Sequence, residues 1–423
     1  MASAYLTRTV TASTATSYTV SFWVKINDIG NTNTPYLWSI GSSAGNGIYF
    51  DSDAKIDFFK QSTSSYLTLY DGVLRDPSAW YHIVWSVNAG TGTAYVNGVT
   101  GNSHSSIPAL NDNTGTKINI HSYVTGAYNT LDCCMAHFHF IDGTAYPAST
   151  FGETNSTSGI WVPKTAPSVT YGTNGFFLKF ENSGSMGLDS SGNGNNFTVS
   201  GTLTQNVDTP SNVFATLNPL TRQASLLTLS NGNTTLTTPS STEFNTATST
   251  LAMSSGKYYF EVKRIAERGL VGITNVETAK LNTTSQYYNG DTDNSNDYGY
   301  YSDDGKVYNN GNPSGSGATW GNNDIVGCAV DLDNRKIYWH KNGTYINSGN
   351  PSAGSGGQSI PSDLTYYFAV SGYTSTTFQC NFGNGFFGTT AVSSAGSNAS
   401  NIGIFEYDVP TGYTALSTKG LNE

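Results

Sequence analysis

The stretch DLDNRKIYWHKNGTYI, residues 331–346, holds one short apolar run between two turn signals. The Asn-Gly pair at 342–343 favours a type I′ hairpin, because both central residues of that turn need positive φ. Successive side chains of a strand point to opposite faces, so Ile337 and Trp339 are expected to share one face. The other face is expected to carry the alternate residues, Tyr338 and His340. The stretch therefore predicts a hairpin inside an antiparallel sheet, and GTAYVNGVT at 92–100 predicts a second one.

The composition indicates an all-β protein and argues against several functions. The 423 residues include 46 glycines and 27 tyrosines, only 11% are charged, and the net charge is −10. Short alternating runs between Gly and Asn turns are typical of strands. The negative charge argues against nucleic acid as a partner, since phosphates require clusters of Lys and Arg. No apolar run reaches the length of a membrane span, so membrane insertion is not expected.

The four cysteines are Cys133, Cys134, Cys328 and Cys380. In so long a chain they are expected to be free, mostly buried thiols, with a bridge between Cys328 and Cys380 as the one alternative. This expectation indicates synthesis in a reducing cytoplasm.

The first half resembles the laminin-G-like, concanavalin A-like jelly rolls over residues 1–202. The resemblance is carried by SFWVK (21–25), WYHIVWSV (80–87) and AYVNG (94–98). It implies a sandwich of two antiparallel sheets. Within it, the alternation of YTVSFWVKI (18–26) predicts a half-buried strand.

The second half resembles a SPRY domain over residues 251–390. The motifs stand in order: YYFEV (258–262), VGI (271–273), YGYYSDDGK (298–306), DIVGCAVDLDNRKIYWHKNG (324–343), FAVSGY (368–373) and FQCNFG (378–383). The fold prediction is thus two antiparallel β-sandwiches, with 203–250 as a connector leading into the second and 391–423 as a C-terminal tail. The two Asn-Gly hairpins then belong to two different sandwich families.

The whole layout is similar to virion proteins of tailed phages, especially those of aquatic bacteria. The carriers are YLTRT (5–9), HFIDGTAY with FGE (139–146, 151–153), GIWVPK (159–164), NGFFLKF (174–180), DSSGNGNNF (189–197), TPSNVFATLNPL (209–220) and GYTALSTKGL (412–421). The resemblance implies a non-enzymatic structural protein on the virion, either a tail fibre or a capsid decoration protein, made in the host cytoplasm. Its partners would be other virion proteins and a host-surface glycan. A homo-oligomer is expected, with a trimer favoured.

The alternative function is a polysaccharide-degrading glycoside hydrolase of the concanavalin A-like fold. Such enzymes need two carboxylates that face one cleft. Glu153, Glu181 and Glu243 lie in or near the first half without a suitable spacing, and Glu406 and Asp408 fall in the predicted tail. We therefore predict no catalytic residue and no enzymatic activity.

One acidic stretch is a candidate calcium loop, and no other cofactor is predicted. DTDNSNDYG (291–299) places Asp291, Asp293 and Asp297 at alternating positions, as calcium loops do. It lacks the central Gly and the closing Glu of an EF-hand. The alternative is a solvated acidic loop.

The remaining candidates for ligand contact are aromatic. They cluster in a turn-rich part of the second half: Tyr287, Tyr288, Tyr298, Tyr300, Tyr301 and Trp320. Aromatic rings stack on sugars or bind partner proteins at little entropic cost. Tyr300 and Tyr301 must point to opposite faces of a strand, so part of this set is expected to be core instead.

Overall fold

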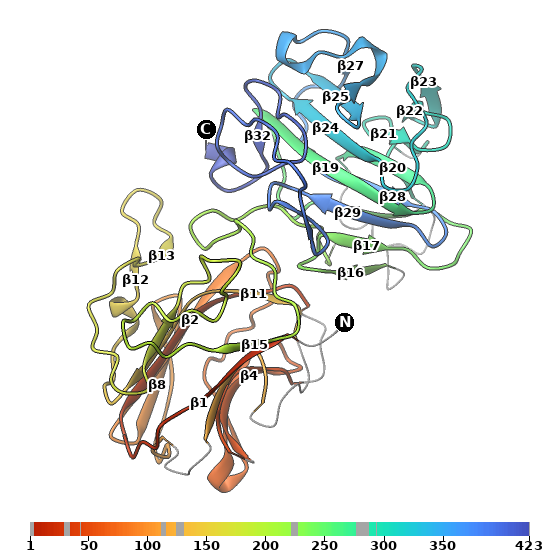
Figure 1. Ribbon diagram of the computed structural model, residues 1–423. Helices are drawn as coiled ribbons and strands as arrows, with labels where there is room; N and C mark the ends of the chain where they lie inside the picture. The colour runs from red at the N-terminus through yellow and green to blue at the C-terminus, as the bar shows by residue number, and fades with distance from the viewer. Residues whose placement is uncertain are drawn as a thin grey trace. The chain divides into compact units, whose positions relative to one another are not determined.

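The computed structural model describes residues 4–28, 34–42, 44–110, 116–123, 131–220, 227–275, 287–292 and 294–422. These residues form strands β1 to β32 and short 3-10 turns, without an α-helix (Figure 1). The predicted all-β class is confirmed. Within the same ranges, no helix is long and apolar enough to span a bilayer.

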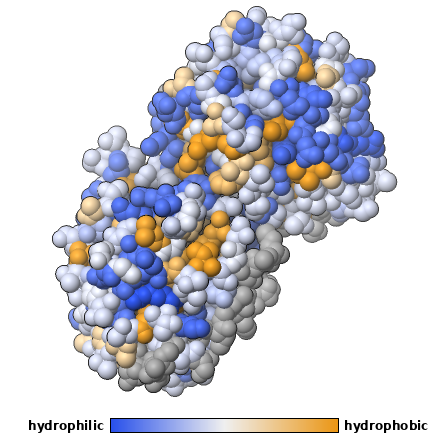
Figure 2. All heavy atoms as spheres, in the orientation of Figure 1, coloured by the Kyte–Doolittle hydropathy of each residue, from blue (hydrophilic) through white to orange (hydrophobic). Residues whose placement is uncertain are grey.

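The chain divides into two compact units. The first unit comprises Met1–Gln205 with Thr209–Ser211, and the second comprises Asn206–Asp208 with Asn212–Glu423. The division lies close to the boundary at residue 202 that the sequence predicts. Hydrophobic residues on the face drawn in Figure 2 form separate patches in a mostly hydrophilic surface.

The first unit is a sandwich of two antiparallel sheets. The seven-stranded sheet has the order β15 (Thr198–Ser200), β1 (Tyr5–Thr9), β10 (Lys117–Ile120), β3 (Tyr36–Gly41), β4 (Gly45–Phe50), β5 (Ile56–Lys60) and β6 (Ser65–Thr68). The six-stranded sheet has the order β14 (Phe176–Leu178), β11 (Cys133–Asp142), β2 (Tyr18–Ile26), β7 (Trp80–Asn88), β8 (Thr91–Val96) and β9 (Val99–His104). Smaller elements are the hairpin β12 (Gly152–Thr154) and β13 (Trp161–Pro163) and the turns η1 (Gln61–Thr63) and η2 (Ala148–Thr150).

Strand β2 is buried on both faces, so the prediction of a half-buried strand is wrong. All nine of its residues are buried. One face joins the core between the two sheets through Val20, Phe22 and Val24. On the outer side of the six-stranded sheet, residues between 146 and 171 form a second, smaller apolar cluster with Val84 and Ile141. The alternating polar residues of β2 therefore lie under this covering segment.

The second unit is also a sandwich. Its larger sheet has the path β16 (Thr228–Ser230), β17 (Thr235–Thr237), β29 (Thr377–Asn381), β19 (Lys257–Ala266), β24 (Ile325–Asp331), β25 (Lys336–Lys341) and β26 (Thr344–Tyr345), with β27 (Gln358–Ser359) beside β25 and β32 (Thr414–Ala415) beside β19. The facing sheet has the order β18 (Asn245–Thr248), β28 (Tyr367–Gly372), β20 (Gly269–Thr274), β21 (Tyr298–Tyr301), β22 (Val307–Asn309) and β23 (Asn312–Ser314). The short elements are β30 (Phe386–Phe387), β31 (Thr390–Ala391), η3 (Ile346–Ser348), η4 (Pro351–Ala353) and η5 (Gly420–Asn422).

The predicted connector and tail are parts of this second sandwich, which corrects the predicted boundaries. Strands β16, β17 and β18 fall inside the predicted connector 203–250. The predicted tail 391–423 covers the outer face of the larger sheet, where β32 pairs with β19 in parallel. An apolar cluster on that face joins Phe214 and Phe405 to Tyr259 and Tyr338. These segments pack because the sheet presents apolar side chains on both faces, which the alternation of single strands does not reveal.

Both Asn-Gly hairpins form as predicted. Asn97 and Gly98 have φ values of 49° and 78°, and Asn342 and Gly343 have 48° and 81°. In each hairpin the Asn side chain also accepts a backbone N–H, which adds a hydrogen bond to the turn. The predicted faces of β25 are confirmed, because Ile337 and Trp339 lie in the core between the sheets while Tyr338 joins the outer cluster.

All four cysteines are free thiols. Cys328 and Cys380 are buried, while Cys133 and Cys134 are half-buried. Cys328 pairs with Phe260, and Cys380 pairs with Val262 of the same strand, β19. One whole strand thus separates the two thiols, so their backbones lie two strand spacings apart, which is about 9–10 Å. That separation exceeds the reach of a disulfide, so the predicted alternative bridge is excluded.

Candidate binding surface

Most of the aromatic residues proposed from the sequence for ligand contact are buried. Tyr287, Tyr298, Tyr300 and Trp320 are each at most 5% exposed. The last three belong to the core between the sheets of the second unit. Their rings are enclosed by protein, so the sequence interpretation as an exposed binding set is wrong for these four.

Asp297 of the candidate calcium loop also points inward. Its carboxylate is fully buried and accepts hydrogen bonds from Thr274 (2.8 Å), Asn294 (2.7 Å) and the Tyr287 hydroxyl. A carboxylate held by these donors is not available to a cation. Asp293 lies outside the described residues, and Asp291 accepts hydrogen bonds from its neighbour Thr292. Among the described residues no group of three or more His, Cys, Asp or Glu side chains could hold a metal ion.

Tyr288 and Tyr301 remain half-exposed, and the structure joins them through a residue that the sequence did not single out. The ring of Phe244 lies 4.9 Å from Tyr288, 6.2 Å from Tyr301 and 5.0 Å from Tyr373, between ring centroids. All four rings are partly exposed. They form the centre of what we call the Phe244 surface.

The ends of neighbouring strands bring this surface together. Phe244 comes just before β18, and Tyr373 comes just after β28. Arg268 precedes β20, and Tyr301 ends β21. These four strands are adjacent and antiparallel, so the four residues meet at one end of the same sheet. Single-sequence reasoning missed Phe244, Arg268 and Tyr373 because they are far apart in the chain, although Tyr373 ends the motif FAVSGY.

Charged side chains frame the rings. The guanidinium of Arg268 lies 4.3 Å from the Tyr373 ring centroid and pairs with Asp303 at 3.0 Å. Asp303 accepts the hydroxyl of Tyr301 (3.2 Å), and Asp304 accepts the hydroxyl of Tyr308 (2.8 Å). Burial raises the pKa of the Tyr301 hydroxyl to about 12, with Asp303 adding to the shift. The phenols therefore remain neutral, and the framing carboxylates disfavour anionic ligands.

A buried serine–histidine contact in the first unit has the wrong tautomer for catalysis. Ser21 Oγ lies 2.9 Å from His82 Nε2, and the Trp161 indole donates to His82 Nδ1 at 2.9 Å. An indole N–H is only a donor, so Nδ1 is the unprotonated nitrogen and Nε2 carries the proton. His82 therefore donates to Ser21 and cannot accept its proton. Burial also lowers the pKa of His82 to about 3.

The carboxylates considered for glycoside hydrolysis lie in different surroundings. Glu153 and Glu181 are exposed. Glu406 accepts from Ser393, and Asp408 accepts from Ser397, so both hold the chain segment 393–397 in place.

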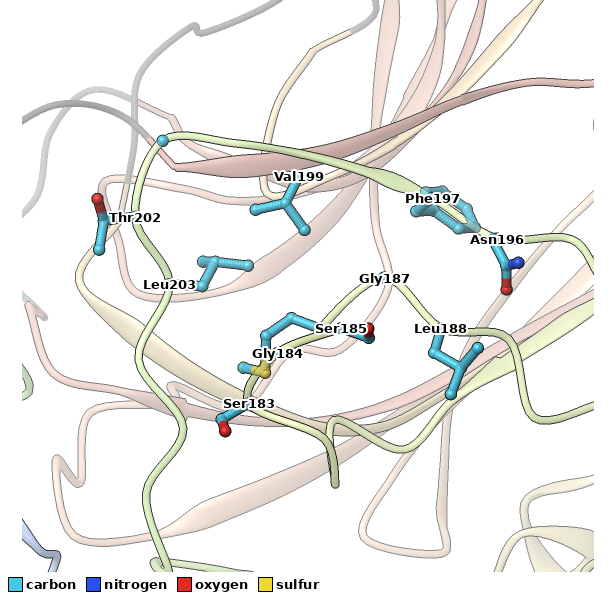
Figure 3. Close-up of a pocket in the computed structure, with 12 residues that line it drawn as sticks. Ser183, Gly184, Ser185, Gly187, Leu188, Asn196, Phe197, Val199, Thr202 and Leu203 are labelled. Atoms are coloured by element: carbon cyan, nitrogen blue, oxygen red, sulfur yellow. The ribbon is translucent and has the colours of Figure 1, made fainter. Parts of the chain in front are cut away.

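One hollow in the described part of the first unit is an open groove of about 540 Å³. Val199 and Leu203 face residues 183–188 across it (Figure 3). A second hollow, of about 360 Å³, lies in the second unit around Lys257 and Tyr413. Neither is lined by any of the site residues predicted from the sequence, and the first has no charged lining residue.

Comparison with known families identifies one domain type in each unit. Residues 2–148 match the concanavalin A-like lectin/glucanases superfamily, and residues 257–351 match the SPRY domain. No curated protein matches the chain.

Similar solved structures include the SPRY domain of human HERC1, with 19% identity, a TM-score of 0.30, and coverage of 39% of this chain and 96% of that one. Another is a SAP-like pentraxin of Limulus polyphemus, with 16% identity, a TM-score of 0.30, and coverage of 38% and 86%. The family matches agree with the predicted order of domains. The chain therefore carries a concanavalin A-like domain followed by a SPRY domain, a combination that suggests a binding or adhesion module.

Proposed function

We propose that this chain is a non-enzymatic adhesion protein displayed on a phage virion, and that it holds its ligand on the Phe244 surface. The observation that carries the proposal is the contact of one half-exposed ring, Phe244, with the rings of Tyr288, Tyr301 and Tyr373. Packed aromatic rings offer a large contact area with few rotatable bonds, which favours binding.

The framing charges support recognition of an uncharged or basic ligand. Asp303 and Asp304 keep spare lone pairs beside the rings, so they can accept hydroxyl or N–H donors of a ligand. Arg268 is already engaged by Asp303 and the Tyr373 ring. The surface thus combines stacking faces with hydrogen-bond acceptors, as glycan and protein recognition both require.

The absence of catalysis is also part of the proposal. The tautomer of His82 and the engagement of Glu406 and Asp408 argue against a hydrolase. We expect the purified chain to release no reducing sugar from β-glucans or other polysaccharides. If the wild type releases reducing sugar and the Glu153→Gln or Glu181→Gln variant does not, the proposed absence of catalysis is contradicted.

Display on a virion rests on the resemblance of the ordered motifs to virion proteins of tailed phages. In such a setting the partners are other virion proteins, and identical copies are arranged by symmetry, with a trimer favoured. Many copies raise the effective concentration of a weak site, which suits adhesion to a host-surface glycan.

The test is mass spectrometry of purified particles of the phage that encodes the chain. Detection with a copy number that is a small multiple of three indicates a tail protein, and on the order of hundreds of copies indicates capsid decoration. Absence of the chain from the particles would contradict virion display. Binding of the particles to host cells, weakened by Tyr288→Ala and Tyr301→Ala, tests the adhesive surface.

A further inference from the structure

The Phe244 surface lies in acidic surroundings. Asp303 and Asp304 accept the hydroxyls of Tyr301 and Tyr308, so both carboxylates stand beside the rings. Further carboxylates adjoin members of the surface along the chain or act on them electrostatically: Glu243 beside Phe244, Glu267 beside Arg268, and Asp291, whose charge after burial raises the pKa of Tyr288. The basic side chains near the rings are those of Arg268 and Lys306. Negative charge is therefore in excess around this surface.

One cation already rests on the surface and belongs to the chain itself. The Arg268 guanidinium lies 4.3 Å from the Tyr373 ring centroid and pairs with Asp303 at 3.0 Å. The face of an aromatic ring is negative and a guanidinium is weakly hydrated, so this contact is favourable at a partly exposed position. The ammonium of Lys306 is more strongly hydrated, and this side chain is exposed. The ring faces thus favour a positive charge that gives up its water easily.

The rings of the surface are inclined to one another and do not form a parallel stack. The Phe244 plane makes angles of 44° with Tyr288, 68° with Tyr301 and 56° with Tyr373. The planes of Tyr301 and Tyr308 meet at 89°. A flat sugar ring stacks on one face, whereas inclined faces can surround a rounded group, as they do in the aromatic cages that hold quaternary ammonium groups.

The neighbouring carboxylates are held in place by donors of the same unit. Asp303 also accepts the Ser302 hydroxyl at 3.0 Å, and Asp304 accepts the backbone N–H of Lys306 at 3.1 Å. Their charge can therefore attract a cation on the rings through space, without a directed hydrogen bond from it. A primary ammonium would have to leave strongly bound water, while a quaternary ammonium has methyl groups in place of N–H donors.

We propose that the Phe244 surface binds a trimethylammonium group, which lies on the faces of Phe244, Tyr288 and Tyr301 while the surrounding carboxylates supply the countercharge. This inference rests on the binding role proposed for the surface above and names the chemical class of its ligand. The methyl groups pack on the rings, and their positive charge interacts with the ring quadrupoles. A phosphate close to the ammonium would be repelled by the same carboxylates, so the group is expected without one.

The test uses the full chain with choline chloride as the probe. The neutral isostere 3,3-dimethylbutan-1-ol, in which carbon replaces the charged nitrogen, is the matched control ligand. Binding is measured by titration calorimetry and by saturation transfer to the methyl protons of the probe. Choline is expected to bind with a Kd on the order of 1 mM, and the isostere about tenfold more weakly. Phosphocholine should bind more weakly than choline, and added salt should weaken choline binding, because exposed charges are screened.

Two variants remove ring faces and retain an apolar side chain. Phe244→Leu is expected to weaken choline binding by about tenfold, since the central ring is lost. Tyr288→Leu removes a half-exposed ring at the side and decides the question if Phe244→Leu does not fold. Tyr367→Leu is the matched control, because Tyr367 is half-exposed at the other end of β28 from Tyr373 and should not affect the binding.

A third variant tests the countercharge. Glu243→Gln/Asp304→Asn removes two negative charges and keeps an acceptor for the Tyr308 hydroxyl. It is expected to weaken choline binding roughly threefold, as two exposed charges would. The same variant should leave the binding of the neutral isostere unchanged.

Three results would overturn the proposal. They are failure of the wild type to bind choline at about ten times the expected Kd, equal binding of choline and the isostere, and choline binding unchanged in the folded ring variants and the charge variant. Adhesion fails separately. Host-cell binding that weakens in Tyr288→Ala/Tyr301→Ala, without any binding of choline, would overturn the ligand class and support adhesion. Choline binding without host-cell binding would support the ligand class and contradict adhesion.

Discussion

The carboxylate of Glu261 accepts a hydrogen bond from the backbone N–H of Tyr407 at 2.8 Å, across 146 positions of the chain. It also accepts the N–H of Glu406 at 2.9 Å, the Tyr259 hydroxyl at 3.0 Å and the Asn381 amide at 3.2 Å. The group is fully buried on the outer face of the larger sheet of the second unit. One carboxylate thus ties the C-terminal segment onto the SPRY domain.

Replacing this carboxylate should therefore loosen the second unit. Glu261→Ala leaves two backbone N–H groups, the Tyr259 hydroxyl and the Asn381 amide without their acceptor in a buried place. We expect a loss of about 3–5 kcal/mol in the free energy of unfolding of this unit. The measurement is chemical denaturation, with the exposed Glu243→Ala as a matched control that should change stability little. Equal stability of the Glu261→Ala and Glu243→Ala variants would show that the hydrogen bonds accepted by Glu261 do not stabilise the second unit.

The first unit should lose stability in mild acid. Burial lowers the pKa of His82 from 6.5 to about 3 and lowers that of His139 well below its usual value. The unfolded chain then binds more protons than the folded one below pH 6.5, so the stability is complete above that pH and is lost as the pH falls toward 3. Each histidine contributes a slope on the order of 1.4 kcal/mol per pH unit.

The second unit should respond less between pH 4.5 and 6.5, because two groups act in opposite directions. Burial lowers the pKa of His340 to about 3, so its contribution to stability rises with pH. Burial raises the pKa of Glu261 from 4.5 to about 7, so its contribution falls with pH. Calorimetry from pH 4.5 to 7.5 should show the steeper change in the first unit, and His82→Gln should flatten it. A stability of the first unit that does not change between pH 4.5 and 7.5 would contradict the lowered pKa values of His82 and His139.

Phe214 is expected to matter for folding. It lies in the stretch TPSNVFATLNPL of the predicted connector, and the structure buries it at 2% exposure within its own unit. Phe214→Asp puts an unpaired carboxylate into the outer apolar cluster, so the second unit should unfold or lose several kcal/mol. Leu220→Asp, at a site that is 50% exposed, is the control that should fold normally. A well-folded Phe214→Asp variant would contradict the buried position.

Thiol titration in denaturant without reductant should detect all four cysteines. The structure keeps Cys328 and Cys380 on opposite sides of β19, which prevents a bridge between them. Detection of only two thiols would mean that a disulfide forms and that the sheet order is wrong.

The sandwiches and their hairpins could be predicted from the sequence because their signals are local. Alternation shows a strand, and Asn97-Gly98 shows a turn, without knowledge of distant segments. The packing of the C-terminal segment on the outer face of the larger sheet could not be predicted, because it depends on contacts between distant residues such as Glu261 and Tyr407. The candidate surface around Phe244 was only partly predictable. Alternation separates Tyr300 from Tyr301 but does not say which one faces the core when aromatic residues occupy both faces.

The most direct measurement of the proposed adhesion uses flow cytometry to follow the binding of the labelled full chain to cells of the proposed phage's host. We predict saturable binding that weakens about tenfold in the Tyr288→Ala/Tyr301→Ala double variant, since a few aromatic residues carry most of the binding energy of such surfaces. Ile404→Ala, an exposed apolar change elsewhere in the same unit, should bind as the wild type does. A double variant that stays folded and binds as strongly as the wild type, or a wild-type chain that does not bind, would contradict adhesion through the Phe244 surface.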